Sequence, residues 1–389
     1  MPKPDAMTPR ERVLMALDHR EPDRVPIDLG GFQTGIHRVA YERLMNHLGL
    51  DEEVAILDPV QQLAKPSEAV LERLRVDTRY ITTNAPSSSR GGLALNERAG
   101  RLWHDLTDEF GVVWSMPDDH RMFMDISHHP LAGASTDDLA SYAWPVGNDP
   151  ARFAGLRGRV AEVGQDGRYA VCTGIGGVVY EYCWYMRGLE RWFIDLIEAP
   201  EFCAALLDRT LAFWMGYYTG FMTEVGDLVD VVMVGDDLAG QSGPLFSPRF
   251  YREIVQPRHA ALVGHIKSMS KARIWYHTCG ACAELIPDLL DNGIDILNPV
   301  QISAVGMDPA DLKHRFGDRL AFWGGGIDSQ HVLPKASPND VRRHARRSVE
   351  AFKPGGGYVF NNVHNVQADV PSENLLALFD AAYEFGSYG

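Results

Sequence analysis

The sequence predicts an α/β fold, a closed (β/α)8 barrel with an irregular insertion near residues 78–150. Apolar runs of four to seven residues each end in Gly, Asp, Asn or His and are followed by amphipathic stretches; they span 169–175, 229–234, 272–276, 295–299, 320–323 and 357–360. Continuous apolar strands that alternate with helices indicate a parallel sheet covered on both faces. A strand near the N-terminus brings the count to at least seven strand–helix units, which favours closure into a barrel.

The length agrees with this interpretation, because one barrel with insertions can occupy all 389 residues as a single domain, 1–389. A doubly wound open sheet is the alternative. That fold usually places a G-x-G-x-x-G turn after its first strand, and the nearest match, at residues 174–177, lacks the last glycine and follows a later strand.

The remaining elements follow from local signals. Thr8-Pro9-Arg10-Glu11 has the N-cap, proline and glutamate of a helix start, and Arg24 to Leu29 is a short strand ended by Gly30-Gly31. Residues 36–75 are rich in helical pattern. The insertion contains short strand-like pieces at 78–82 and 112–115 and many turn residues. Further helices are expected at 189–199, 201–218, 248–269, 283–292 and 372–385.

Composition excludes several classes of protein. There are 37 Lys and Arg against 52 Asp and Glu, a net charge of −15, which argues against a nucleic-acid binder or an anionic-membrane binder. An apolar run long enough to span a membrane and the apolar core of a signal peptide are both missing from the sequence. Five cysteines in a long chain do not form a disulfide framework. We therefore expect a soluble, cytoplasmic, enzyme-sized protein.

Polar residues stand where the predicted strands end, and in such a barrel the chemistry lies at these ends. They are Asp236-Asp237, His277-Thr278-Cys279-Gly280, Asn298, Asp328 and the segment Asn361-Asn362-Val363-His364-Asn365. Because the carboxyl ends of all strands meet at one mouth, residues far apart in the sequence are expected to converge there.

His277 and Cys279 are the most informative pair. Residues i and i+2 of an extended segment point the same way, and an imidazole with a thiolate suits zinc. A catalytic zinc needs a third protein ligand and an open position. His364 is the candidate, and Cys282, in the form C-x-x-C with Cys279, is its competitor. The structural alternative is a pair of small buried cysteines and a histidine that hydrogen-bonds a loop.

Asp236 and Asp237 are the candidate catalytic carboxylates, because they emerge directly from the apolar run that ends at Val234. A carboxylate in this place can hold a substrate ammonium, accept a proton, or orient a metal-bound histidine. It can equally cap the backbone of a following turn. Both interpretations stay open at the level of sequence.

Over nearly its whole length the chain resembles the uroporphyrinogen decarboxylase superfamily. The matching segments are Arg10–Val13, Arg24–Pro26, Met186–Glu190, Gly243–Pro248, His277–Gly280, Gly355–Tyr358 and Asp369–Asn374. The resemblance implies a TIM barrel and, commonly, a homodimer.

Two branches of the superfamily are relevant. Decarboxylases carry an arginine-rich segment that clamps the substrate's carboxylates and an acid at a later strand end, whereas this chain has Ile27–Gln33 and Ile81-Thr82-Thr83-Asn84 in those places. Cobalamin-linked methyltransferases are similar and bind zinc through His-x-Cys and a late Cys. His277 and Cys279 match that pattern, and His364 stands at the third position, so the implied ligand set is His/Cys/His.

The resulting prediction is a zinc-dependent methyltransferase that moves a methyl group between a small ether, amine or thiol and a corrinoid. The chain has no D-x-H-x-x-G motif, so the cobalamin is expected on a separate protein or free. A metal-free decarboxylase of a porphyrinogen is the second hypothesis, and a non-catalytic tetrapyrrole-binding protein is the third.

Overall fold

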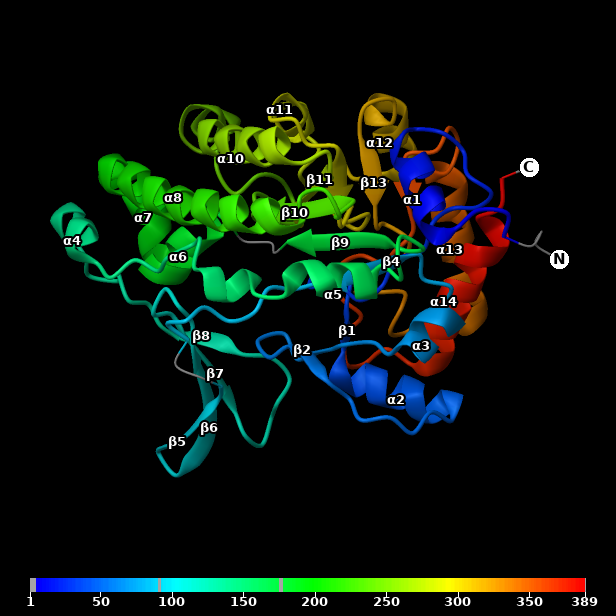
Figure 1. The fold of residues 1–389 in the computed structure, drawn as a ribbon, viewed down its shortest axis with the longest axis horizontal. Helices are drawn as coiled ribbons and strands as arrows, with labels where there is room; N and C mark the ends of the chain where they lie inside the picture. The colour runs from blue at the N-terminus through cyan, green and yellow to red at the C-terminus, as the bar shows by residue number, and fades with distance from the viewer. Residues whose placement is uncertain (1–4, 90–91, 175–177, 389) are drawn as a thin grey trace.

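A seven-stranded parallel sheet forms the centre of the protein (Figure 1). The computed structural model describes residues 5–89, 92–174 and 178–388. Ile175, the last residue of the predicted strand 169–175, lies outside the described residues, as do Gly176 and Gly177 of the glycine-rich segment 174–177. In spatial order the strands are β4 Thr78–Ile81, β9 Ala170–Gly174, β10 Val231–Gly235, β11 Arg273–His277, β12 Ile296–Asn298, β13 Ala321–Trp323 and β14 Tyr358–Val359. The six predicted apolar runs each contain a strand, and the predicted α/β barrel fold is confirmed.

The N-terminal segment that was expected to be the first strand closes the ring. Phe360 donates its backbone N–H to Pro26 at 2.8 Å on one side, and Asp77 donates to Ile27 at 2.8 Å on the other. Ile27 forms an isolated parallel bridge to Phe360 rather than a continuous ladder. The segment therefore occupies the eighth position between β14 and β4, although Pro26, which has no N–H, limits its pairing.

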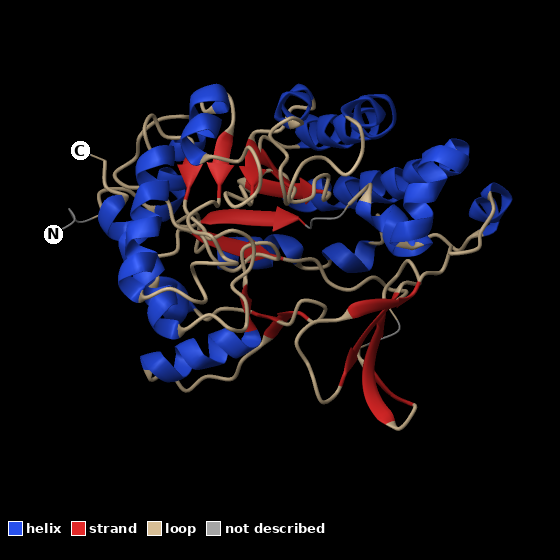
Figure 2. Ribbon diagram, turned by 180° about the vertical axis from the view of Figure 1, so that it is seen from behind, coloured by secondary structure: helices blue, strands red, loops and turns tan. Residues whose placement is uncertain are grey.

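Helices cover the outside of the sheet (Figure 2). They are α1 Pro9–Leu17, α2 Arg38–Leu48, α3 Glu68–Arg73, α5 Leu156–Val163, α6 Glu181–Arg187, α7 Leu189–Glu198, α8 Pro200–Val225, α10 Gln256–Met269, α11 Ile286–Asp291, α12 Pro309–Phe316, α13 Pro338–Phe352 and α14 Ser372–Phe385. The capping box at Thr8 is present. The helix expected over 248–269 is built from α9 Pro248–Phe250, a π-turn at Tyr251–Val255 and α10. Within the described chain, every helix falls short of the length or apolar character that a membrane crossing requires.

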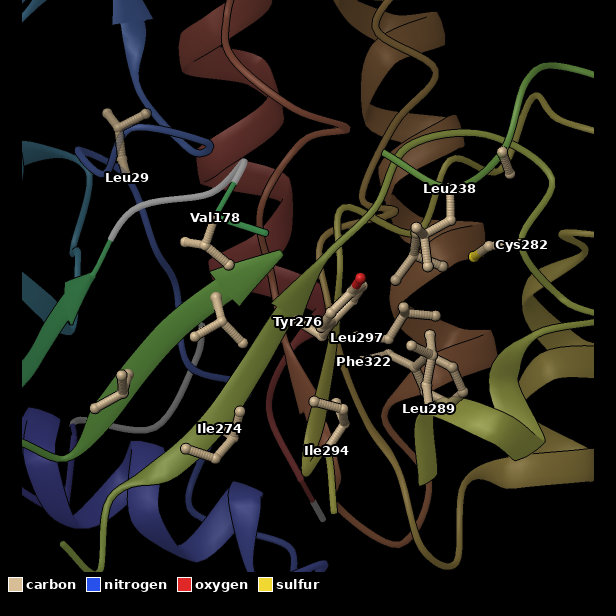
Figure 3. Packing of buried hydrophobic residues seen from close by; sticks show 14 of the residues in the cluster. Leu29, Val178, Leu238, Ile274, Tyr276, Cys282, Leu289, Ile294, Leu297 and Phe322 are labelled. Carbon is tan, nitrogen blue, oxygen red and sulfur yellow. The ribbon is translucent and has the colours of Figure 1, made fainter. Parts of the chain in front are cut away.

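Alternate residues of each strand enter two separate cores. One set, which includes Ile274, Tyr276, Leu297 and Phe322, packs outward against the helices, as Figure 3 shows beside Leu289 of α11. The other set fills the barrel together with Val13 and Leu17 of α1 and consists of Ala170, Cys172, Val231, Met233, Trp275, Ile296, Ala321, Trp323 and Val359. The rings of Trp275 and Trp323 stack with centroids 4.9 Å apart. The interior is thus a packed floor, and space for a ligand begins above it.

The insertion is more regular than the sequence suggested. Its first predicted strand, at 78–82, is β4 of the main sheet, so the insertion begins after that strand. It then forms an antiparallel sheet of β5 Ala94–Arg98, β6 Arg101–Thr107, β7 Val113–Pro117 and β8 Asp125–His128, followed by α4 Thr136–Ser141 and a 3-10 turn at Pro150–Phe153. We call the β5–β8 sheet with its 118–124 loop the cap. In Figure 1 the cap lies on the side toward which β9 points.

A third, small sheet joins the cap to the barrel. It consists of β1 Ile36–His37, β3 Leu63–Ala64 and β2 Ile56–Asp58. The cap loop is attached to it by two hydrogen bonds: Met124 donates its N–H to the carbonyl of Val60 at 2.8 Å, and Nε2 of His37 lies 2.7 Å from the carbonyl of Met122. The cap loop is therefore held against the carboxyl end of the barrel.

Candidate active site

A cavity of about 500 Å³ lies where the carboxyl ends of the strands meet the cap. This volume is in the range of small-molecule sites. Its described lining comes from the barrel, the small sheet, α6 and the cap, namely Phe32, Gln33, His37, Asp58, Val60, Gln61, Leu63, Trp114, Met122, Phe123, Met124, Glu181, Tyr182, Tyr185, Asp237, His277, His364, Asn365 and Gln367.

Three of the residues named from the sequence come together beside this cavity, and two of them, His277 and His364, line it. His277 is the last residue of β11, Cys279 follows two positions later, and His364 lies in the loop after β14. One ligand atom from each lies within 4.8 Å of the other two. Nε2 of His277 is 3.6 Å from Sγ of Cys279, and the two imidazole rings have centroids 5.2 Å apart. We call His277, Cys279 and His364 the metal cluster.

The spacing suits a tetrahedral ion. With Zn–N of about 2.05 Å and Zn–S of about 2.3 Å, the N–S edge of a tetrahedron is about 3.6 Å, which equals the distance between His277 and Cys279. Nδ1 of His277 lies 2.6 Å from Oδ1 of Asn298, whose own amide donates to the carbonyl of Trp323. Nδ1 therefore carries the ring proton, and the lone pair of Nε2 is free to face the cluster.

His364 is held by its own backbone. It has a left-handed φ of 59°, uncommon for a residue with a side chain, and Asn362 donates to its carbonyl at 2.5 Å. The N–H of Asn365 donates to Nδ1 of His364 at 2.8 Å, so in this conformation the ring proton sits on Nε2. Ligation through Nε2 requires the proton to move to Nδ1, at the expense of that one hydrogen bond.

Burial sets the protonation of the metal cluster. It lowers the pKa of His277, and burial together with the neighbouring His277 lowers the pKa of His364 to about 4. Burial and the nearby carboxylates of Asp237 and Glu181 raise the pKa of the Cys279 thiol. The imidazoles are therefore neutral, as ligands must be, and the thiolate needs a cation beside it to form.

Cys282, the competitor for the third ligand position, lies elsewhere. It is fully buried, its Sγ is 4.0 Å from Sδ of Met307, and burial raises the pKa of its thiol to about 12. It packs among apolar side chains of the outer core. The structure thus brings His364 rather than Cys282 to His277 and Cys279.

The two candidate carboxylates have different surroundings. Asp237 lines the cavity; its Oδ1 accepts the N–H of Cys279 at 2.7 Å and is 3.9 Å from Nε2 of His277. Asp236 is fully buried outside the lining and accepts the N–H groups of Val179, Tyr180 and Glu181 at 2.8–3.1 Å. It holds the start of α6, which is the capping interpretation left open by the sequence, whereas Asp237 has the place of a site residue.

Two other strand-end candidates have structural contacts. Asn298 acts through His277, as described above. Asp328 accepts the N–H groups of Gln330 and His331 at 2.9 and 3.0 Å in the loop after β13, and it is not part of the described cavity lining. The expectation that site residues follow the ends of the strands therefore identified the correct end of the barrel, but some of the side chains that it named have structural roles.

Glu181 is a cavity residue that the sequence did not single out. It is the first residue of α6, and Tyr185 donates its hydroxyl to Oε1 at 3.2 Å. Burial and the neighbouring carboxylates of Asp237 and Asp236 raise its pKa well above the ordinary value. Its position depends on Asp236, 55 residues away, which fixes the first turn of α6. The sequence held one indirect signal for Glu181. Asp236, the first residue of the acidic pair after β10, is buried and must accept hydrogen bonds from a backbone segment, which proves to be the start of α6.

Aromatic side chains form one wall of the cavity, which we call the cap wall. Trp114 of the cap and Tyr185 of α6 meet edge to face with centroids 5.2 Å apart, and Tyr182 lies 5.3 Å from Tyr185 in the same manner. Met122, Phe123 and Met124 of the cap loop complete the wall. The insertion thus contributes directly to the cavity.

Comparison with known proteins places these features in a family. The family model described as uroporphyrinogen decarboxylase (URO-D) matches residues 163–385, more than half of the chain. The protein named uroporphyrinogen decarboxylase from Methylococcus capsulatus is 28% identical over 194 residues, 49% of this chain and 51% of the relative. The protein of the same name from Thioalkalivibrio sulfidiphilus is 32% identical over 97 residues, 24% of this chain and 27% of the relative. The match spans about half or less of these relatives.

A solved structure extends the likeness to the whole chain. A methyltransferase from Methanosarcina mazei aligns with a TM-score of 0.67 at 18% identity, over 97% of this chain and 99% of that one. At this identity the alignment shows a shared fold.

Proposed function

This chain belongs to the uroporphyrinogen decarboxylase (URO-D) family, and on that premise we propose that it is a zinc-dependent methyltransferase. It exchanges a methyl group between a small ether, amine or thiol and a corrinoid. The metal cluster carries this proposal, because His277, Cys279 and His364 offer two imidazoles and a thiol within 4.8 Å at the end of a cavity of ligand size.

Each residue of the site has a separate role in this proposal. His277, Cys279 and His364 hold the ion, and Asn298 fixes the ring of His277. A bound Zn²⁺ supplies Lewis acidity toward a heteroatom of the substrate. Asp237 fixes the backbone of Cys279 and faces His277, which makes it the positioning carboxylate of the site. Glu181, whose pKa is raised by burial and by the neighbouring carboxylates of Asp237 and Asp236, can exchange a proton with the heteroatom as the methyl group leaves or arrives.

The corrinoid is an external partner in this proposal. The sequence contains no D-x-H-x-x-G motif, so a separate corrinoid protein or the free cofactor brings the cobalt to the cavity. The cytoplasm is the compartment we propose, since the reduced corrinoid and the Cys279 thiolate both need reducing conditions.

Decarboxylation is the second candidate, and the names of the curated relatives favour it. Uroporphyrinogen carries eight carboxylates, which need cationic partners. The described lining of the cavity contains no lysine or arginine, and it includes the acid Asp237. A polyanion placed there loses its hydration without gaining a positive partner, which is unfavourable. This charge distribution favours methyl transfer.

Zinc content tests the metal cluster. Protein purified without chelator and remetallated under reducing conditions is expected to hold about one zinc per chain, because a three-residue cluster with one open position binds one ion. Cys279→Ala should lose it. Cys282→Ala is the matched control, since that thiol lies outside the cluster, and it should keep the zinc. Zinc-free wild-type protein, or equal loss in both variants, contradicts the proposed ligand set.

Activity separates the three hypotheses. Wild-type protein with reduced cobalamin is incubated with methyl ethers, methylamines and methyl thioethers, and the cobalamin spectrum reports methylation. His277→Ala should abolish transfer while circular dichroism stays that of the wild type. Release of carbon dioxide from uroporphyrinogen would assign the decarboxylase instead. Tight corrinoid binding without turnover of any donor would indicate a binding protein.

A further inference from the structure

We propose that the substrate of this cavity is a methyl ether on a single aromatic ring that carries no carboxylate, phosphate or sulfonate. This inference rests on the proposed function and narrows it to one class of methyl donor. It follows from the charges that line the cavity, from the rings of the cap wall, and from the chemistry of the group that must leave.

The charges of the described lining disfavour anions. Asp237 lines the cavity, and lysine and arginine are missing from its described residues, so an anion finds no cationic side chain there. The arginines closest in the chain to the cavity loops are engaged elsewhere: Arg38 donates to Gln62 at 3.1 Å, and Arg121 pairs with Asp118. Both line a separate hollow beside the cap.

A bound ion does not reverse this balance. The two positive charges of Zn²⁺ meet the thiolate of Cys279 in its coordination shell and the carboxylate of Asp237, which reaches within 3.9 Å of Nε2 of His277. These two negative charges offset those of the ion. An anionic substrate group therefore gains no net attraction at the metal cluster, and elsewhere in the cavity it meets acids and amides.

The cap wall suits a flat ring. Trp114 and Tyr185 are fixed edge to face at 5.2 Å, and Trp184 packs against Tyr185 at 4.2 Å from behind. Aromatic rings prefer such edge and offset contacts with other rings, beyond what buried area alone supplies. Met122 and Met124 add flexible, polarizable side chains that adjust to the ring's outline.

The leaving group supports an aromatic ether over an alkyl ether. When the methyl group leaves, the O–CH3 bond breaks with its electron pair on oxygen, the corrinoid supplies the pair for the new bond to carbon, and the oxygen takes up a proton. The hydroxyl of a phenol, as in tyrosine, has a pKa of about 10. That of bulk water, whose O–H bond resembles that of an alkyl alcohol, is about 15.7. A phenolate is therefore released more easily, and Glu181 lies in the same cavity to protonate it.

Three probes of matched shape test the inference by calorimetry on the zinc-loaded full chain. 4-Methoxybenzyl alcohol is the neutral aromatic ether, 4-methoxybenzoate adds one carboxylate, and (4-methoxycyclohexyl)methanol removes the aromaticity. The alcohol is expected to bind at least fivefold more tightly than either of the others. Undetectable binding of the alcohol, or binding of either comparison probe within fivefold of it, overturns the proposal.

Variants of the cap locate the binding. Trp114→Ala should weaken binding of the aromatic alcohol at least threefold. If that variant does not fold, Phe123→Ala replaces it, because Phe123 is 58% exposed and its removal should not disturb the core. Leu102→Ala, on the cap but outside the described lining, should bind like the wild type. Phe123→Arg should bring 4-methoxybenzoate closer to the alcohol. Unchanged affinities in the Trp114 and Phe123 variants would also refute the inference.

These measurements need neither corrinoid nor turnover, so they separate the two proposals. If the probes bind in the expected order but no donor methylates cobalamin, the proposed function fails and the specificity of the cavity stands. If cobalamin is methylated by carboxylated or non-aromatic donors in preference to the aromatic ether, the function stands and this inference fails.

Discussion

Asn298 orients His277 of the metal cluster, and its replacement gives the sharpest test of the proposed zinc site. Its Oδ1 accepts the proton on Nδ1 of His277 at 2.6 Å, and both side chains are buried. Asn298→Ala leaves that N–H unpaired and frees the ring to turn or to change tautomer. Loss of such a partner weakens metal binding about 10–100-fold, equivalent to about 1.4–2.7 kcal/mol. This agrees with the cost of about 1–3 kcal/mol for a buried donor left unpaired.

The assay is competition for zinc against a chromophoric chelator. Asn298→Asp keeps an acceptor for His277 and should stay within threefold of the wild type, because a carboxylate also raises the basicity of the ring. Asn292→Ala is the matched control: this buried amide donates to the hydroxyl of Tyr251 at 3.0 Å and has no hydrogen bond to a residue of the cluster, so its loss should not change zinc affinity. Equal affinities for wild type and Asn298→Ala, or equal losses in Asn298→Ala and Asn292→Ala, would refute the reasoning.

Three further variants probe the frame of the site. Asp236→Ala removes the acceptor of three backbone N–H groups at the start of α6. At about 1–3 kcal/mol for each unpaired group, the free energy of unfolding should fall by several kcal/mol and the urea midpoint should fall with it. A midpoint like that of the wild type would argue against the capping role. Gly235→Ala places a Cβ 2.3 Å from the carbonyl of His277, so β11 must shift and zinc affinity should fall, as chelator competition would show. Burial raises the pKa of Asp28 from 3.8 to about 6, so its contribution to stability is full below pH 4 and is lost as the pH rises to about 6, by about 3 kcal/mol. Asp28→Asn should remove that part of the pH dependence, and a midpoint-versus-pH curve parallel to that of the wild type would contradict it.

The fold was predictable because its signals are local. Each barrel strand is an apolar run that ends in a polar residue, and the helix at Ser372–Phe385 has the bounds expected from its periodicity. The strand expected at 112–115 is β7 of the cap sheet, whereas β5 was not predicted, since it is exposed along its whole length and lacks the alternation of a half-buried strand. β4 was assigned to the insertion because its place beside β9 is decided by a pairing across about ninety residues of chain.

The closeness of His277 and Cys279 was predictable for the same reason, whereas most other contacts of the site were not. His277 and Cys279 stand two residues apart after a strand, so the sequence places them on one side. The different surroundings of Asp236 and Asp237 depend on where α6 begins, which is a tertiary contact. Glu181 enters the cavity through that contact, and the aromatic wall needs the cap to fold back over the barrel. Neither leaves a periodic or short-range pattern.

The loop that carries His364 has a consequence for the order of assembly. Asn361 donates to the carbonyl of Asp28 at 2.6 Å, and Gly35 donates to Asn365 at 2.6 Å, so this loop is fastened to a segment more than 300 residues earlier. That segment precedes the part of the chain that the family model matches. Contacts at such separation form late, because the entropy of closing a long loop must be met first. We therefore expect His364 to reach His277 and Cys279 late in folding, and, with zinc bound as proposed, the rate of zinc uptake during refolding would report on that step.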